Sequence, residues 1–375
     1  MRTKFYLLIV FVVAGYFADA QAVLFSQYYA SPLTLNPALT GKFDGFARVD
    51  GIYRGQYYGL SQSSSIFRTP AISADFSLLK DKMNGNALGI GLSVVNDQQT
   101  STGADPSGTG TSVGKIGNTS IALDLGYTLN LNKKKTIQLS VGLEPSISMK
   151  NTTGAYEYPQ AFNSNLVYDV TSPNNEALAS PKKTYFNFAY GLFFNHQALD
   201  WMTYYLGFAM DNVARPQTAV ISTNNANGKL PFLFVVHGGF EFKVAKKWTL
   251  IPGVLYQNEA KANEANAGIT AGYDVIDKEK NGIRRKATIY LGFWDRMGND
   301  VGSAFQERNV TPKIGFDYMR FRVDFAYDIS VGNIASDAHP VPGVYRPQAY
   351  ELAISYIFGG PKPLKEREYL FNPRY

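Results

Sequence analysis

The sequence contains no cysteine and only three histidines among its 375 residues. The lack of cysteine excludes a disulfide framework and a thiolate metal site. Beyond the first 20 residues no stretch approaches 18 uninterrupted apolar residues, which excludes membrane-spanning helices. Charged residues make up 18% of the chain and are dispersed along it, so the net charge of +6 does not indicate a nucleic-acid partner.

The first twenty residues are typical of a secretory signal peptide. Arg2 and Lys4 supply the positive charge, and the apolar stretch from Phe5 to Phe17 is too short to span a bilayer. Ala18-Asp19-Ala20 has the small-residue pattern of a cleavage site. We therefore expect residues 1–20 to be a signal peptide, with the mature exported chain starting at Gln21.

Strict alternation of apolar and polar residues is the main signal in the rest of the chain. Between Arg320 and Val331 every second residue is apolar, and the residues between them are charged or small. Successive side chains of a strand point to opposite faces, so this pattern predicts a strand with one apolar face. The segments 120–129, 136–144 and 232–244 repeat the pattern.

About fourteen such strands are predicted, and the connections between them alternate in length. The predicted strands begin near Phe43, Ser65, Asn86, Lys115, Lys135, Thr184, Met202, Phe232, Lys247, Glu264, Arg284, Pro312, Arg320 and Pro347. The long connections are predicted at 97–114, 151–183, 214–231, 297–309 and 332–346, with two of middling length at 59–64 and 258–263. Short turns on one side and long loops on the other are typical of outer-membrane β-barrels.

The sequence therefore predicts an all-β fold, a transmembrane antiparallel β-barrel in the bacterial outer membrane. We expect an N-terminal segment at 21–42, a barrel at 43–358 and a C-terminal tail at 359–375. Both termini are predicted to lie in the periplasm, with the long loops outside the cell. The barrel surface implies outer-membrane lipids as neighbours.

Charged residues on the predicted lumen faces favour a packed ionic network over an aqueous ion path, since buried charges persist when they are paired. They are Asp124, Glu144, Glu241, Lys243, Asp317, Arg320, Arg322, Asp324 and Asp328. His237 lies in a predicted strand without a serine or carboxylate at a motif spacing, and we interpret it as a member of a hydrogen-bond network. Gly89 and Gly91 lie inside a strand, the wrong context for a nucleotide site. We expect no catalytic residue, metal or cofactor.

Aromatic residues in the predicted outer loops are candidates for binding a partner, because aromatic anchors within polar surroundings are typical of protein-binding surfaces. The candidates are Tyr156, Tyr158, Phe162 and Phe305. Each is equally compatible with the aromatic girdle at the membrane edge.

A cluster of motifs follows the predicted signal peptide. It comprises Phe25, Gln27 and Tyr28, then Asn36, Pro37 and Gly41, and finally Arg54 and Gln56. These residues resemble the PorP/SprF family of the type IX secretion system of Bacteroidetes, with Tyr57 where that family typically has tryptophan. The resemblance extends over the whole mature chain, and its N-terminal motifs are the more specific part.

The resemblance implies a non-enzymatic barrel that supports secretion or surface anchoring of large adhesins or other cargo with a C-terminal sorting domain. It also implies other type IX secretion components as partners, a role of some members in gliding motility, and a FadL-like barrel with an N-terminal segment inside. The alternative function is a FadL-like channel for apolar or small solutes. A barrel enzyme ranks below both.

The residues themselves leave the position of the 21–42 segment open. Pro32 and Pro37 oppose a barrel strand, while Phe25, Tyr28 and Leu33 give the segment more apolar surface than a free tail carries. Packing in the lumen and a tethered strap under the barrel are both compatible with this composition.

Overall fold

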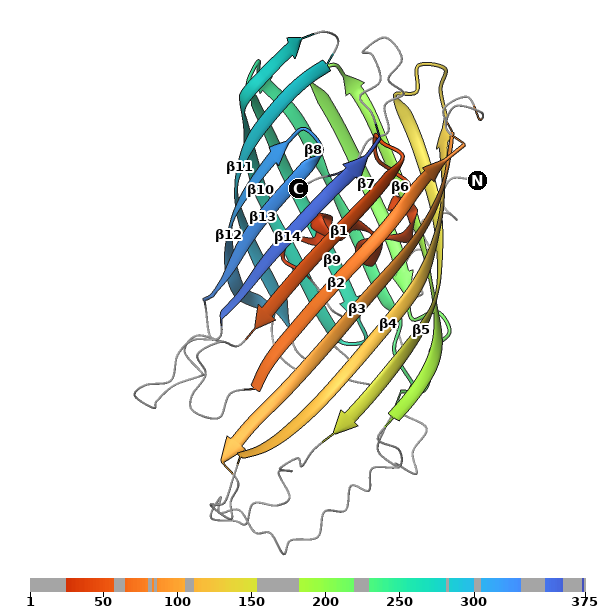
Figure 1. Cartoon of the computed structure of the whole chain (residues 1–375), viewed down its shortest axis with the longest axis vertical. Helices are drawn as coiled ribbons and strands as arrows, with labels where there is room; N and C mark the ends of the chain where they lie inside the picture. The colour runs from red at the N-terminus through yellow and green to blue at the C-terminus, as the bar shows by residue number, and fades with distance from the viewer. Residues whose placement is uncertain are drawn as a thin grey trace, which may run out of the picture.

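The structure is a computed structural model of the chain, and it contains one closed β-barrel (Figure 1). It describes residues 25–56, 65–79, 83, 86–104, 111–153, 182–218, 229–280, 283–299, 305–331, 348–359 and 373. Within these residues no helix is long and apolar enough to cross a membrane.

Fourteen antiparallel strands form the barrel. They are β1 (Ala47–Gln56), β2 (Ser65–Leu78), β3 (Ala87–Ala104), β4 (Thr111–Asn130), β5 (Ile137–Thr153), β6 (Lys182–Leu199), β7 (Met202–Asp211), β8 (Leu233–Ala245), β9 (Trp248–Glu259), β10 (Ala262–Lys280), β11 (Ile283–Asn299), β12 (Gln306–Tyr318), β13 (Phe321–Ser330) and β14 (Gln348–Phe358). Each strand pairs with its neighbours in sequence, and β14 pairs with β1 to close the ring. The prediction of about fourteen antiparallel strands is confirmed.

Alternation sorts the side chains of each strand between the outside and the lumen. In β13, Phe325 is 41% exposed on the outer surface, whereas its neighbour Ala326 is 1% exposed. Large apolar residues such as Leu143, Phe186 and Leu291 share the outer surface. A barrel with an apolar outer band and a polar interior is suited to a bilayer, because closure satisfies every strand edge.

The two ends of the barrel differ, as predicted. The strand pairs β6–β7, β8–β9 and β12–β13 are joined by short turns at one end, which we call the turn rim. The opposite end, the loop rim, carries the connections β5–β6, β7–β8 and β13–β14. Because the number of strands is even, the first strand begins and the last strand ends at the turn rim.

Two predicted outer loops are corrected by the structure. The polar segment 97–114 was predicted as a loop, but β3 continues to Ala104 and β4 starts at Thr111. A hairpin that projects beyond the bilayer has water on both faces, so it needs backbone pairing but no apolar face. The predicted middle-length loop at 258–263 is a tight turn, in which the Asn258 side chain donates hydrogen bonds to the carbonyl oxygens of Ala260 and Ala262.

The segment before β1 lies inside the barrel, where Figure 1 shows its short helical turns within the ring of strands. It contains η1 (Tyr28–Ala30), α1 (Pro32–Leu35) and η2 (Pro37–Leu39). We call residues 25–46 the N-terminal plug. Of the two positions that the sequence leaves open, the structure selects the lumen for the described part of this segment. Residues 1–24, which include the predicted signal peptide, lie outside the described residues.

Candidate functional site

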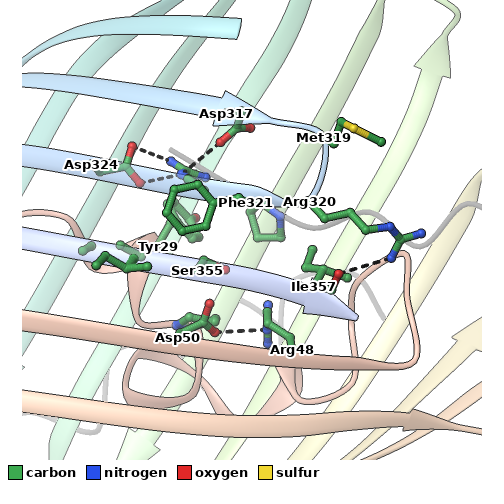
Figure 2. A pocket seen from close by; sticks show the side chains of 16 residues that line it. Tyr29, Arg48, Asp50, Asp317, Met319, Arg320, Phe321, Asp324, Ser355 and Ile357 are labelled. Atoms are coloured by element: carbon green, nitrogen blue, oxygen red, sulfur yellow. Dashed lines mark hydrogen bonds and ion pairs between the residues drawn. The ribbon is translucent and has the colours of Figure 1, made fainter. Parts of the chain in front are cut away.

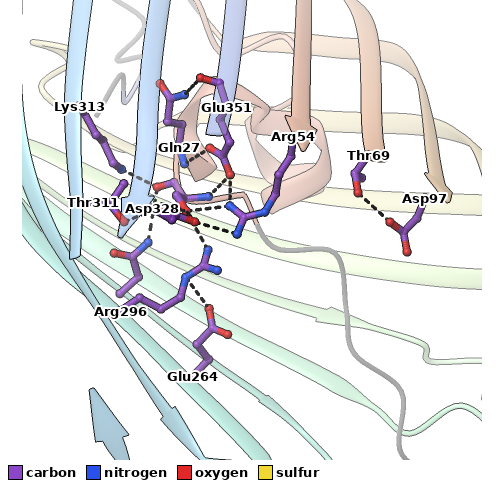
Figure 3. Close-up of polar contacts among 12 residues, drawn as sticks. Gln27, Arg54, Thr69, Asp97, Glu264, Arg296, Thr311, Lys313, Asp328 and Glu351 are labelled. Atoms are coloured by element: carbon purple, nitrogen blue, oxygen red, sulfur yellow. Dashed lines mark hydrogen bonds and ion pairs between the residues drawn. The ribbon is translucent and has the colours of Figure 1, made fainter. Parts of the chain in front are cut away.

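The first anchor of the N-terminal plug is a carboxylate that binds backbone amides. The N–H groups of Ser26 and Gln27 donate to the two oxygens of Glu351 on β14, at 2.6 and 2.8 Å (Figure 3). The plug backbone is irregular here and lacks strand partners, so the carboxylate supplies acceptors that the lumen otherwise lacks. This contact joins the start of the described chain to its last strand.

An ionic network surrounds this anchor. Arg54 of β1 forms ion pairs with Glu351 and with Asp328, the latter at 2.8 Å. Ser26 Oγ donates to Asp328 at 2.8 Å and accepts from Arg54 at 2.8 Å and from Arg296 at 3.1 Å. Figure 3 shows these side chains converging from separate strands. The charges of this network are therefore paired with one another, as the stability of buried ions requires.

Aromatic residues form a second layer of contacts. Tyr28 packs edge-on against Trp294 with ring centroids 5.6 Å apart, and Tyr29 packs edge-on against Tyr205 at 5.7 Å. The Tyr29 hydroxyl lies 2.8 Å from Nδ1 of His237. These T-shaped pairs are favourable ring geometries, and they attach the plug to β7 and β11.

His237 is a hydrogen-bonding residue, as the sequence indicates. Its Nε2 accepts from the Asn36 amide at 3.1 Å, which leaves Nδ1 protonated and donating to Tyr29. Asn36 also caps the turn that follows it, since its Oδ1 accepts from the Ala38 N–H at 2.9 Å. The Asn-Pro step of the sequence motif thus forms both a local turn and a contact with the wall.

This turn packs against a row of glycines on the barrel wall. Gly89, Gly126, Gly142 and Gly191 are directly paired in register across β3, β4, β5 and β6. A Cβ atom on Gly142 would lie 2.2 Å from the carbonyl carbon of Pro37, and one on Gly191 would lie 1.9 Å from Asn36 Oδ1. The missing side chains therefore allow the plug backbone to approach the wall.

The plug ends in a third anchor. Gly41 has a φ of +70° and donates its N–H to Asp75 at 2.7 Å. Arg48 binds the same carboxylate through Nε at 3.0 Å and its terminal nitrogen at 2.8 Å. The glycine of the sequence motif is needed here for the left-handed backbone, and a Cβ on it would also meet Gly89 at 2.5 Å.

Lys42 is the plug residue whose charge depends on pH near neutrality. It is fully buried, donates to Gln138 Oε1 at 3.0 Å and lies over the Phe193 ring. Burial lowers the pKa of Lys42 from 10.5 to about 7. Between these values the folded protein carries fewer protons than the unfolded chain, so stability rises as pH increases from about 7 to about 10.5.

We expect replacement of Lys42 with methionine to remove this rise. The measurement is the urea midpoint of unfolding of the detergent-solubilised barrel from pH 7 to 10. Lys286→Met is the matched control, because the Lys286 side chain is 42% exposed, so its replacement should leave the rise intact. Equal pH profiles for the native protein and Lys42→Met would contradict the assignment.

The structure brings most of the predicted motif residues together. Phe25 is buried against Ile52, Ala71 and Ala353, and the contacts of Gln27, Tyr28, Asn36, Pro37, Gly41 and Arg54 are those described above. Gln56 lies half-buried at the end of β1, away from the plug anchors described above.

The predicted partner-binding residues are placed differently. Tyr156, Tyr158 and Phe162 lie outside the described residues, and Phe305 is 50% exposed at the loop rim, just before β12.

Several residues of the site were not selected from the sequence. They are Asp75, Glu264, Asn266, Arg296, Lys313, Glu351 and the glycine row. The sequence signal for this row was one glycine at a lumen-facing position in each of four successive strands. The ionic partners carry no comparable local signal, because each lies in a different strand.

Two further spaces adjoin the plug. At the turn rim, a small cleft of about 30 Å³ is lined by ionic groups, including the pairs Arg48–Asp50 at 3.1 Å and Arg322–Asp324 at 2.5 Å (Figure 2). These pairs and the Arg54–Asp328 pair agree with the predicted ionic network. On the loop-rim side, a cavity of about 220 Å³ is bordered by Phe25 of the plug. No group of His, Asp and Glu in the described ranges is arranged to hold a metal ion.

A closed antiparallel barrel with an apolar exterior and a charged lumen defines a β-barrel protein of the bacterial outer membrane. Residues 17–356 match the model of the type IX secretion system membrane protein PorP/SprF. The chain belongs to this family, and membership implies other components of the secretion system as partners.

Comparison with solved structures finds barrels of similar shape. The toluene transporter TbuX of Ralstonia pickettii is 10% identical, with 86% of this chain and 92% of that chain covered and a TM-score of 0.47. The toluene transporter TodX of Pseudomonas putida is 11% identical, with 87% of this chain and 92% of that chain covered and a TM-score of 0.48. A FadL homologue of Pseudomonas aeruginosa is 11% identical, with 88% of this chain and 94% of that chain covered and a TM-score of 0.44. At these TM-scores the likeness carries no argument about substrate. No curated protein matched the chain.

Proposed function

We propose that this protein is a non-enzymatic component of the type IX secretion system. In this proposal it supports the secretion or surface anchoring of a large adhesin-like protein that carries a C-terminal sorting domain. The loop rim faces outward and binds that protein, while the turn rim and both chain ends face the periplasm. Outer-membrane lipids contact the apolar exterior.

The observation that carries this proposal is the anchored plug. The plug is bound to β14 by Glu351, to β6 by the Asn36 amide and to β2 by Asp75. Contacts with opposite walls of the lumen hold it across the barrel interior. Because the plug occupies the lumen, the rims are the parts of the barrel that can contact a partner protein. This favours a docking role over free diffusion of solutes through the barrel.

The loop rim offers the surface that such docking needs. Phe305 exposes half of its ring surface there, and the connection between Thr153 and Lys182 carries the aromatic residues named in the sequence analysis. Aromatic side chains within polar surroundings are common anchors of protein interfaces.

The test is a replacement of residues 154–181 with a short Gly-Ser linker. We expect the variant barrel to assemble and to show heat-modifiable electrophoretic mobility, but to lose co-purification of the secreted partner from outer membranes. A matched control replaces residues 219–228, the connection between β7 and β8, with a linker of the same kind. Retention of the partner by the 154–181 variant would contradict docking through this loop.

A channel for apolar or small solutes is the second candidate function. The observation that favours it is a small space of about 30 Å³ beside the plug, lined by Tyr28, Tyr290 and Trp294 among others. Aromatic walls of this kind bind small apolar ligands. Rapid solute entry into liposomes that contain the purified barrel, together with absence of any secreted protein in the purification, would favour the channel over docking.

A further inference from the structure

The loop-rim cavity is lined by acidic groups without basic ones. Its described walls include Asp97 of β3, Glu144 of β5, Asp211 of β7 and Glu259 of β9, and no lysine, arginine or histidine lines it. Phe25 and Thr34 of the N-terminal plug close it on the side of the turn rim. The acidic lining contrasts with the turn-rim cleft, where carboxylates and arginines alternate.

The hydrogen bonds of the walls leave an acceptor in the cavity. The amide nitrogen of Asn187 donates to Asp211 Oδ1 and to Asn212 Oδ1, both at 2.9 Å. These two bonds fix the orientation of the amide, so the oxygen of Asn187 is the atom left over. Asn187 lines the cavity, is 6% exposed, and its Oδ1 has no hydrogen-bond partner among the residues that the structure describes. A buried acceptor without a donor indicates that a donor from outside the chain completes the site.

The carboxyl groups near the cavity wall lie close enough to affect one another electrostatically. Glu144 lies within electrostatic range of both Asp124 and Asp211, and it shares a side-chain hydrogen bond with Asp124. That bond needs a proton on one of the two carboxyl groups, whereas the negative charge of the other carboxylates is stabilised by a counter-charge nearby. An ammonium or guanidinium group satisfies both requirements, since it is positively charged and has only hydrogen-bond donors.

The spacing of the acidic groups argues for an extended ligand over a metal ion. The four carboxylates project from alternate strands of the barrel wall, and in the described part of the chain they do not form a metal-binding cluster. The cavity has a volume of about 220 Å³, and its lining extends along the wall from β3 to β9.

We propose that this cavity binds an extended organic cation with two or more ammonium or guanidinium groups. A linear polyamine and the basic side chains of an inserted peptide share this chemistry. The proposal does not depend on the docking function, because it concerns the lumen wall and not the outer loops.

Calorimetric titration of the purified full-length barrel with spermine in low-salt detergent buffer tests the proposal. We expect saturable binding that weakens as NaCl is added, because screening reduces attraction between charges. The double variant Glu144→Gln/Asp211→Asn should bind at least about tenfold more weakly, since each charge-assisted hydrogen bond lost has an effect of that order. Asp317→Asn, in the turn-rim cleft, is the matched control and should bind spermine as the native protein does.

A second variant makes the test independent of the loss of carboxylates. Ser146 lines the cavity, and Ser146→Lys places an ammonium group of the protein itself there. We expect it to abolish spermine binding in barrels that keep heat-modifiable mobility. A titration with a tetralysine peptide distinguishes the two sources of the cation, a polyamine and an inserted peptide. The peptide binds only if the cavity admits a peptide chain. Absence of saturable spermine binding up to about 1 mM, or equal binding by all variants, would overturn the proposal.

Discussion

Replacing Gly142 with alanine is expected to displace the N-terminal plug from the barrel wall. The added Cβ would lie 2.2 Å from the carbonyl carbon of Pro37 and 2.3 Å from the Ala38 nitrogen, well inside van der Waals contact. Both atoms belong to backbone, which cannot move without disturbing the Asn36 contacts on the same turn. Overpacking of this kind typically costs about 1–3 kcal/mol, and here that cost opposes the docking of the plug.

The measurement is limited proteolysis of the folded barrel, with cleavage near Lys42 as the report of a released plug. Single-channel conductance of the reconstituted protein provides a second readout, which should increase when the plug leaves. Gly51→Ala on β1 is the matched control, because no heavy atom of the described residues beyond its two chain neighbours lies within 4 Å of its Cβ position. If Gly142→Ala and Gly51→Ala gave the same protection and conductance, the glycine row would have no role in receiving the plug.

Replacing Glu351 with alanine is expected to destabilise the protein by about 3–5 kcal/mol, the usual effect of removing one partner from a buried ion pair. The change leaves the Arg54 guanidinium without one carboxylate and the N–H groups of Ser26 and Gln27 without acceptors. Uncompensated buried donors and charge both oppose folding. Urea unfolding of the barrel in detergent, followed by electrophoretic mobility, measures the effect.

A half-exposed ion pair provides the control. Lys286 pairs with Asp274 at 3.1 Å and its side chain is 42% exposed, so Lys286→Ala should cost no more than about 1 kcal/mol. A double-mutant cycle between Arg54→Ala and Glu351→Ala should be strongly non-additive, because the two side chains are in direct contact. Additive losses would show that the two residues act independently, against the network described here.

The glycine row and the carboxylate anchors restrain the plug by different physical means. The glycine row works by shape and permits close approach, whereas Glu351, Asp328 and Asp75 work by charge and hydrogen bonding. Steric fit is insensitive to salt, and buried pairs are screened far less than exposed ones. We therefore expect the plug to stay in place over a wide range of ionic strength.

Strand positions could be predicted closely from local pattern. The expected starts at Ser65 and Met202 coincide with the first residues of β2 and β7, and most others lie within a few residues of the observed ones. The reason is that a barrel strand repeats one face every second residue, which is visible in a short window. The hairpin at 97–114 was not predicted, because a hairpin outside the bilayer needs no apolar face and these residues do not alternate between apolar and polar.

The motif residues were found from the sequence, but their contacts were not. Asn36 and Pro37 indicated a turn, yet nothing in the sequence paired that turn with glycines on β3 to β6. His237 was assigned to a hydrogen-bond network without a named partner, and the structure supplies Tyr29 and Asn36. Local chemistry is readable from neighbours in sequence, whereas these partners lie on other strands.

The sequence by itself determined the barrel, its strand number, its outer and inner faces and the family to which the chain belongs. Each depends on a short-range period or a contiguous motif. The residues left the position of the plug open although the family resemblance implied the lumen, and the tertiary structure decided it. The tertiary structure alone showed that Arg54 pairs with Glu351, which is 297 positions away. Closure of β1 on β14 brings them together, and such a contact depends on the whole ring, not on any local segment.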